Sequence, residues 1–558
     1  MRQMRVTEWT KEQVEGINYA GDKNVLIRGV AGSGKTMVLA ERAIRLHEEA
    51  VARGERGRVA IMSFNHTILF AIREYLNARH VKTEDIVLTS LGQAVSKLHK
   101  KICHRETDVI ENSIDKNLLE DVMDDHFATH FKRVRNRLQN KKFIWFLRGE
   151  LAWMKQHHIC RFADYESAVR YGRESFTLLP AEKQYVFDLY IEYFSHQDMA
   201  VYYIEDVYNE LYNRRNRISA EDRFDYVLVD DIQDMPLNHL QMIPALCNYS
   251  YTVAGDYSQR LYSQGSPWKE AKDFLPADTI TLTKSFRSSQ KIMALANNLL
   301  SHNRLLYSDT GAYLPPDVMG EPGERPLMYR FDTMYEEEYG IAKILKKMME
   351  KYPGDTIAVL TPTAFTTGKL RKELFKNGIP AQLLNSDGLY DLNAGIKVST
   401  YYSVKGLSFD HVICVKVDNE TMLGKRGTEW PSLRQDQVDL SATALYLGMT
   451  RARKTLRLTY SRELGRAPFM KELDKTLLTD KPVPGSEEAM LYRIHLGCPN
   501  AADLKRIVGR KVENKIRGLG IIYTTDTKNK LLYVDFDNGT SDIFPARALS
   551  KGGLQFVG

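Results

Sequence analysis

The sequence predicts an α/β protein with two parallel-sheet domains, a helical insertion in the first and a small β-barrel at the C-terminus. Two sets of short apolar, β-branched runs alternate with stretches of helical periodicity, one before residue 260 and one after residue 350. Such alternation is typical of parallel sheets covered by helices. Residues 95–221 are instead rich in aromatic and helix-forming residues, and short runs with tight turns follow residue 508.

Length, charge and cysteine spacing restrict the class of protein. A chain of 558 residues is too long for one core, and its net charge of +7 fits a polyanionic partner without requiring one. The five cysteines lie far apart, so we expect no disulfide framework and no zinc site. No apolar run suits a membrane helix or a signal peptide. We therefore expect a cytoplasmic protein without a membrane partner.

A phosphate-binding loop follows the first apolar run, residues 24–28. The pattern G-x-x-x-x-G-K-[ST] is matched by Gly29, Val30, Ala31, Gly32, Ser33, Gly34, Lys35 and Thr36. Its glycines let backbone N–H groups face phosphate oxygens, and the following helix adds positive potential at its N-terminus. We expect Lys35 to reach the β- and γ-phosphates of ATP and Thr36 to hold Mg²⁺. A chance glycine-rich turn is the alternative, which the flanking strand and helix disfavour.

Acidic residues end a second apolar run, residues 226–229. We expect Asp230 to bind Mg²⁺ through water and Asp231 to orient or deprotonate the attacking water. An acidic pair at a strand end can also cap a turn. Arg287 and Arg451 are candidates for stabilising charge on the transferred phosphoryl group. Their spacing alone favours surface or ion-pairing arginines instead.

The order of the motifs resembles the UvrD/Rep/PcrA group of superfamily 1 DNA helicases. Residues 9–13 are similar to the segment whose glutamine reads adenine, and residues 230–234 to the D-E-x-Q-D box. Residues 255–262 resemble G-D-x-x-Q-x-I-Y, and Phe286-Arg287 resembles a Tyr-Arg pair. Residues 400–409 and 446–452 resemble T-x-H-x-x-K-G-L-E-F and Y-V-A-x-T-R-A. The match extends over residues 9–462 in family order.

The resemblance implies that ATP is hydrolysed between two RecA-like domains whose motion drives single-stranded DNA, in the family from 3′ to 5′. It assigns catalysis to Lys35, Asp230, Asp231, Gln259, Arg287 and Arg451. It adds Gln13, Phe286 and Gly406 to the phosphate loop as residues around the nucleotide. It implies nucleic-acid contacts from Phe64, Asn65, Thr89, Tyr257, Thr400 and Tyr402.

The resemblance also divides the chain. The first RecA-like domain, 1A, comprises residues 1–95 and 221–290 around a helical 1B insertion at 96–220. The second, 2A, covers 291–475, and a linker at 476–507 leads to a Tudor/SH3-like barrel at 508–558. In the family this barrel contacts RNA polymerase, although a generic barrel used for packing is equally compatible with the sequence. A monomer is expected.

Several positions depart from the family pattern. Asp231 stands where the family has Glu, which shortens its reach by roughly 1.5 Å, and a misplacement of about 1 Å can cost on the order of 10² in rate. We therefore expect slow basal ATP turnover. Tyr402 and Ser408 replace a histidine and a glutamate, which affects the DNA and ribose contacts. About 35 residues separate Thr363 from Ser399, too few for the duplex-binding 2B subdomain of the family.

Two functions of different class remain open. One is a motor that moves along single-stranded DNA. The other is a slow ATPase switch whose barrel recruits a partner such as RNA polymerase or a nuclease. A P-loop kinase is a third alternative, which the second α/β domain with its arginine element disfavours.

Overall fold

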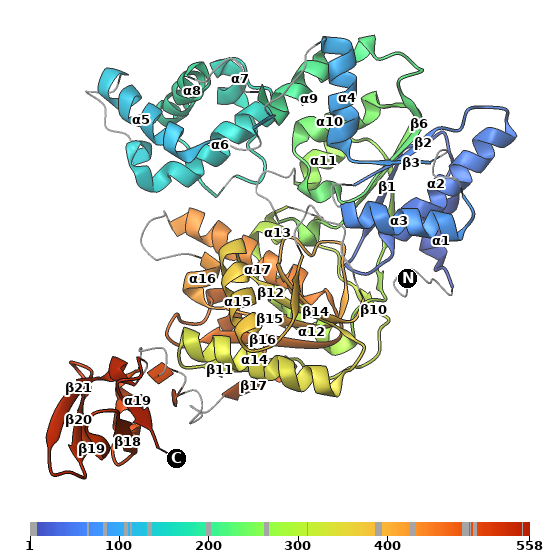
Figure 1. Ribbon diagram of the computed structural model, residues 1–558. Helices are drawn as coiled ribbons and strands as arrows, with labels where there is room; N and C mark the ends of the chain where they lie inside the picture. The colour runs from blue at the N-terminus through green and yellow to red at the C-terminus, as the bar shows by residue number, and fades with distance from the viewer. Residues whose placement is uncertain are drawn as a thin grey trace.

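The described residues of the computed structural model form three large sheets, two two-stranded sheets and a layer of helices (Figure 1). The residues described here are 8–63, 66–81, 86–104, 110–111, 114–130, 137–173, 175–196, 202–261, 267–309, 311–384, 393–423, 431–482, 490–491, 493–494, 499–549 and 551–557. None of the described helices combines the length and apolar character needed to cross a bilayer.

The first sheet has six parallel strands in the order β3-β2-β6-β7-β1-β8. They are β1 (Val25–Gly29), β2 (Val59–Met62), β3 (Ile86–Thr89), β6 (Phe224–Val229), β7 (Cys247–Gly255) and β8 (Asp278–Leu282). Helices α1 (Lys11–Asn18), α2 (Lys35–Ala52) and α3 (His66–Ala78) lie to one side. Helices α4 (Leu91–Cys103), α9 (Ile204–Asn213), α10 (Leu237–Ala245) and α11 (Trp268–Phe274) lie to the other. β1, β2 and β6 are almost fully buried, as their apolar runs predict for central parallel strands.

A helical layer interrupts the first sheet between β3 and β6. It contains α5 (Lys116–His130), α6 (Ile144–Gln156), α7 (Phe162–Ser167) and α8 (Pro180–Ser195), with η1 (Arg137–Gln139) and η2 (Lys141–Phe143). Its own apolar core runs from Ile114 to Tyr203, and β4 (Ile110–Glu111) pairs with β5 (Tyr202–Tyr203) at its base. α4 and α9 belong instead to the core beside the first sheet.

A buried carboxylate organises this layer. Glu150 is fully buried on α6 and accepts hydrogen bonds from Tyr165, Arg170 and Arg173. Burial opposes its charge, but the Arg173 and Arg170 guanidinium groups outweigh that effect and lower the pKa of Glu150 to about 2. The layer therefore depends on a satisfied ionic network as well as on its apolar core.

The second sheet has seven parallel strands in the order β13-β14-β12-β15-β16-β11-β17. They are β11 (Leu327–Phe331), β12 (Thr356–Thr361), β13 (Ala381–Leu383), β14 (Gly395–Thr400), β15 (Phe409–Cys414), β16 (Ala452–Ser461) and β17 (Thr479–Pro482). Its helices are α12 (Gln290–Leu300), α13 (Arg304–Ser308), α14 (Met334–Lys351), α15 (Ala364–Lys376), α16 (Asn419–Leu423) and α17 (Pro431–Met449). One buried apolar cluster runs from Leu26 through α12 and α17 to Leu478, so the two sheet domains pack against each other.

The C-terminal unit is an antiparallel sheet in the order β21-β20-β19-β18-β22. Its strands are β18 (Lys511–Asn514), β19 (Gly518–Asp526), β20 (Leu531–Phe536), β21 (Ser541–Pro545) and β22 (Gln555–Phe556). Because β21 and β22 form the two edges, the described residues make an open sheet, whereas the sequence predicted a barrel. The Asn538-Gly539 turn joins β20 and β21 as predicted, with Gly539 at φ 81°.

Arg493 connects this unit to the second sheet domain. Its buried guanidinium donates to Glu336, on α14, and to Asp503, on α19 (Ala501–Arg506). The side chains of Arg493, Glu336 and Asp503 are all nearly inaccessible to solvent. The C-terminal sheet is therefore attached through a buried ionic contact as well as through the chain.

Candidate nucleotide-binding site

The glycine-rich loop lies between β1 and α2 at the carboxyl edge of the first sheet. Gly32 and Gly34 have φ values of 77° and 83°, which side chains rarely adopt. Lys35 Nζ donates to the carbonyl oxygens of Gly29 and Val30, at 2.8 and 3.0 Å. The ammonium group is thus held over the loop that precedes it.

Gln13 closes one side of this loop from α1. Its amide donates to Ser33 O at 2.9 Å, and a Cβ at Gly34 would lie 2.9 Å from the same nitrogen. Thr10 and Gln13 form a capping box that starts the helix and fixes the position of Gln13. The residue expected to read adenine therefore lies against the loop.

The acidic pair follows β6. The Thr36 hydroxyl donates to Asp230 Oδ2 at 2.5 Å, so the two predicted Mg²⁺-binding side chains are in contact. Burial, together with the charge of Asp231, raises the pKa of Asp230 above its usual range. Asp231 has the opposite shift: burial opposes its charge, but the Lys405 ammonium outweighs that effect and lowers the pKa of Asp231. The two carboxylates therefore differ in how readily they hold a proton.

Segment 284–287 packs on the phosphate loop. The Phe286 N–H donates to Gly32 O at 3.1 Å, and the Ser285 hydroxyl donates to Ala31 O at 2.7 Å. A Cβ at Gly32 would lie 2.6 Å from Arg287 Cβ, so this glycine permits the close approach. The Phe286 side chain is 49% exposed beside the loop. Within the described part of the chain, Arg287 Nη1 is buried and has no hydrogen-bond partner.

Arg451 reaches the first sheet domain from the second. It lies between α17 and β16 and is 1% exposed, and its Nη2 donates to Gln259 Oε1 at 2.6 Å. Gln259 donates in turn to Asp256 Oδ2 at 2.5 Å. The Asp256 N–H donates to Gln233 Oε1 at 3.1 Å, and the Gln233 amide donates to Asp231 Oδ1 at 3.1 Å. One chain of hydrogen bonds thus links Arg451 to the acidic pair.

Lys405 also reaches the acidic residues from the second domain, and it is not among the site residues predicted from the sequence. Its Nζ lies 2.5 Å from Asp234 Oδ2 and 3.4 Å from Asp231 Oδ1. Both carboxylates raise the pKa of Lys405 although burial opposes the charge. Its neighbour Gly406, expected near the nucleotide, is exposed at φ 79°. The lysine of the K-G motif was the signal that could have indicated this contact.

The residues expected to contact nucleic acid differ in position and in exposure to solvent. Thr89 and Thr400 lie at the carboxyl ends of β3 and β14, and Tyr402 is 37% exposed in the turn that follows β14. Tyr257 is 4% exposed, with its ring 5.1 Å from that of Trp268, so it offers no free face in this conformation. Phe64 and Asn65 lie outside the described residues.

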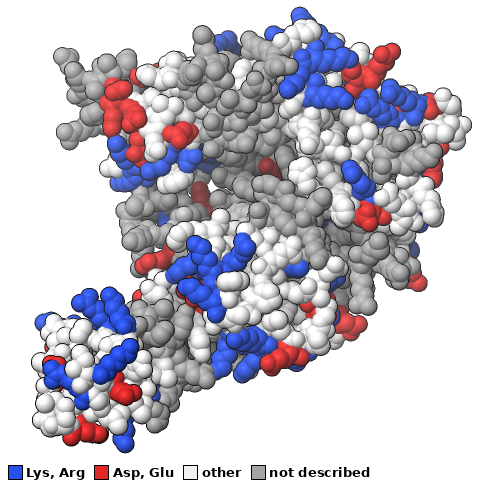
Figure 2. Space-filling model, in the orientation of Figure 1, with Lys and Arg blue, Asp and Glu red and all other residues white. Residues whose placement is uncertain are grey.

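Charge alone does not mark a nucleic-acid path on the face shown in Figure 2. Basic side chains form several separate groups there and are mixed with acidic ones. The half-buried Thr89 and Thr400 and the exposed Tyr402 are therefore the more specific indicators.

The described residues fit a nucleotide triphosphate with Mg²⁺. Thr36 and Asp230 offer oxygen atoms of the type that Mg²⁺ prefers, and the helix N-terminus with Lys35 suits phosphate. Arg287 Nη1 and Ser33 Oγ are buried polar atoms beside the loop that lack a hydrogen-bond partner among the described residues. Buried groups of this kind are usually satisfied, so a ligand that pairs with them is favoured.

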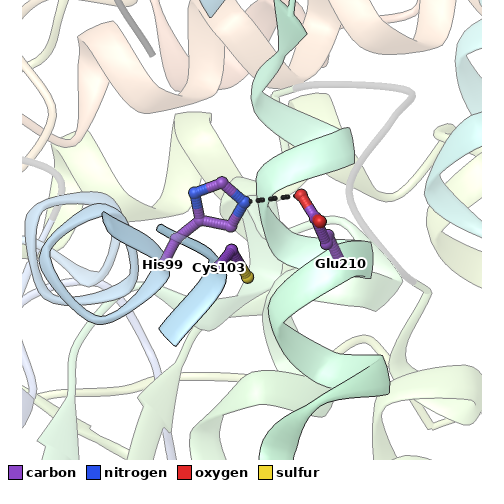
Figure 3. Close-up of side chains that lie close together, drawn as sticks. All are labelled: His99, Cys103 and Glu210. Atoms are coloured by element: carbon purple, nitrogen blue, oxygen red, sulfur yellow. Dashed lines mark hydrogen bonds and ion pairs between the residues drawn. The ribbon is translucent and has the colours of Figure 1, made fainter. Parts of the chain in front are cut away.

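A second group of possible metal ligands lies between α4 and α9 (Figure 3). Atoms of His99, Cys103 and Glu210 lie within 4.8 Å of one another, and His99 Nε2 is 2.8 Å from Glu210 Oε2. Arg214 Nη1 lies 2.8 Å from Glu210 Oε1, and the Tyr202 hydroxyl donates to Oε2. Because Arg214 already neutralises the carboxylate, we interpret this group as a helix–helix contact.

Comparison with protein families decides which family this arrangement represents. The profile of the UvrD/REP helicase N-terminal domain matches residues 9–273, and that of the UvrD-like helicase C-terminal domain matches residues 280–393 and 387–463. The chain belongs to the UvrD/Rep helicase family. The parallel sheets are consistent with the two RecA-like domains of UvrD/Rep helicases.

Individual relatives of the UvrD/Rep family are distant. The chain is 24% identical over 391 residues to the ATP-dependent DNA helicase Rep of Buchnera aphidicola. The alignment covers 65% of this chain and 56% of Rep. It is 24% identical over 233 residues to the ATP-dependent DNA helicase PcrA of Leuconostoc citreum, covering 38% and 29%. The chain thus spans about half or less of these relatives. A solved C-terminal domain of a possible DNA helicase from Lactobacillus plantarum WCFS1 aligns at 21% identity and TM-score 0.26, over 35% of this chain and 98% of that domain.

Proposed function

We propose that the protein is an ATP-dependent translocase on single-stranded DNA. The observation that carries the proposal is the meeting of groups from both sheet domains at one edge. Lys35, Thr36 and Asp230 come from the first domain, and Arg451 joins them from the second through Gln259. A two-domain site of this kind couples nucleotide chemistry to movement between the domains.

Each side chain has a separate task in this proposal. Lys35 and the loop N–H groups bind the phosphates, and Thr36 and Asp230 hold Mg²⁺, which supplies neutralisation of phosphate charge when bound. Asp231 orients the attacking water or accepts its proton. Arg287 and Arg451 stabilise the negative charge that develops on the transferred phosphoryl group. A single arginine in this role can raise the rate by roughly 10³–10⁵.

We propose that the strand crosses the carboxyl ends of both sheets. Thr89 and Thr400 lie there, and Tyr402 offers an exposed ring for base stacking. Between β12 and β14 the described residues form only α15 and β13. The two matched pieces of the C-terminal profile also overlap, over residues 387–393. Both observations support a chain without a 2B subdomain, and therefore movement on single strands without processive unwinding. The 3′ to 5′ direction is proposed from the family resemblance alone.

A slow ATPase switch is the second candidate, and the C-terminal sheet favours it. Leu519, Ile521 and Tyr523 on β19 and Ile543 on β21 are each at least 40% exposed. Alternate residues of one strand point to one face, so an apolar face is available to a protein. We propose that this Tudor-like unit holds a partner such as RNA polymerase or a nuclease in either function.

ATP turnover with and without nucleic acid tests the proposal. Turnover by the wild type is expected to rise with single-stranded DNA and to fall to background in K35A. K376M, which changes an exposed lysine on α15 paired with Glu373, is the matched control and should retain turnover. Nucleotide binding without turnover on single-stranded DNA, duplex DNA or RNA would select the switch and reject the motor.

A further inference from the structure

Lys405 connects the ATP site of the first domain with the proposed nucleic-acid path of the second. Its ammonium contacts Asp231 and Asp234, which follow β6 of the first domain. Lys405 itself lies in the turn 401–406 that follows β14 of the second domain. The side chains of Lys405, Asp231 and Asp234 are 16%, 17% and 7% exposed, so water screens their attraction weakly.

The same turn carries the residues placed on the nucleic-acid path. Tyr402 O accepts the Lys405 N–H at 3.4 Å, and the Thr400 hydroxyl accepts the Ser403 N–H at 3.1 Å. These local hydrogen bonds make residues 400–405 one short unit. A strand that contacts Tyr402 therefore binds the same turn that carries Lys405.

Asp231 cannot act freely while Lys405 is bound to it. A water-orienting carboxylate needs an oxygen directed at the nucleophile, and the ammonium attracts that oxygen and neutralises its charge. Positive charge at this point also opposes a cation beside Asp230. The contact seen here is therefore a resting arrangement that must change before hydrolysis.

We propose that Lys405 is a latch that restrains Asp231 in the free protein and is withdrawn when a nucleic-acid strand binds the turn 401–406. The latch deepens the proposed function, on which it rests, by naming how nucleic acid regulates the ATP site. It is a positioning role, because Lys405 acts through Asp231.

The variant K405M tests the latch because methionine keeps an unbranched side chain and removes the charge. Basal turnover is expected to rise, and the stimulation by single-stranded DNA to fall, by about fivefold or more. The Mg²⁺ concentration for half-maximal basal turnover should fall in K405M. K376M should change neither quantity.

Hydrogen–deuterium exchange of residues 401–407 supplies a measurement without turnover. Exchange in the nucleotide-free protein should be faster in K405M than in the wild type, and single-stranded DNA should accelerate it in the wild type only. A thermal midpoint in K405M close to that of K376M shows that the fold is intact.

Two results would overturn the latch. One is unchanged basal turnover, stimulation and exchange in K405M. The other is loss of basal and stimulated turnover together in a folded K405M, which would make Lys405 a catalytic residue. If the wild type shows no turnover with any nucleic acid, the proposed motor fails, and the exchange comparison still decides the latch.

Discussion

Asp231 is the residue whose local geometry most restricts the chemistry of the site. It has a φ of 62°, in the left-handed region, and its Oδ1 accepts a hydrogen bond from Gln233. Its side chain is also shorter than the glutamate of the family pattern. The backbone and two neighbours thus fix where this carboxylate can reach.

Lengthening this side chain gives the first prediction. D231E should raise nucleic-acid-stimulated turnover by up to on the order of 10²-fold, because a misplacement of about 1 Å at a reacting group has effects of this size. D231N should lower it, since the amide cannot accept a proton. Steady-state turnover at saturating ATP measures both. Equal turnover in D231E and the wild type would mean that the short reach is compensated elsewhere.

Asp230 gives a prediction on pH. Burial and the charge of Asp231 raise its pKa to about 6, so the folded protein holds this proton where the unfolded chain releases it. The resulting stabilisation is complete below the ordinary pKa near 4 and is lost as the pH rises through about 6. Unfolding free energies without Mg²⁺ should therefore decline for the wild type relative to D230N, by roughly 3 kcal/mol between pH 4 and 7. Parallel curves for the two proteins would contradict this assignment.

At the scale of elements, the helical layer is stabilised differently from the sheets. E150A removes the carboxylate that Tyr165, Arg170 and Arg173 share, and leaves two buried cations without their shared anion. We expect a loss of about 3–5 kcal/mol in unfolding free energy, measured by urea denaturation. K141A, which breaks an exposed pair with Asp124, should cost less than about 1 kcal/mol and is the control. Similar losses in both variants would show that the buried network stabilises the fold no more than an exposed ion pair does.

The central strands could be predicted from sequence because a strand buried on both faces must be continuously apolar. The apolar runs at residues 24–28 and 226–229 overlap β1 and β6. Strands β8 and β11 are not marked by such runs, since only two of the five residues in each strand are buried. The loop and acidic pair followed from local motifs. The K-G motif marks Lys405 itself, whereas the Asp234 carboxylate that it contacts lies 171 positions away, outside that motif.

At the scale of the whole molecule, the balance of charge and the short β12–β14 connection shape the interaction with nucleic acid. Affinity for single-stranded DNA should fall steeply with salt, because phosphate contacts release counterions. Fluorescence anisotropy between about 50 and 200 mM salt should show a linear decline of log affinity with log salt concentration. A salt-independent affinity would exclude a phosphate-dominated interface.

Duplex DNA gives the last prediction. In a strand-displacement assay the isolated protein should release little product, although translocation on the single-stranded overhang should proceed. Translocation can be followed by displacement of streptavidin from a biotinylated single strand. Strong unwinding by the protein alone would show that another surface replaces the 2B subdomain.

The buried Arg493 contact makes the C-terminal sheet travel with α14. In the proposed translocase, a protein bound to that sheet would move with the second domain. ATP cleavage would then pull on the bound protein as well as on the DNA strand. A force that holds the bound protein in place would oppose that domain movement and would therefore lower the rate of ATP turnover.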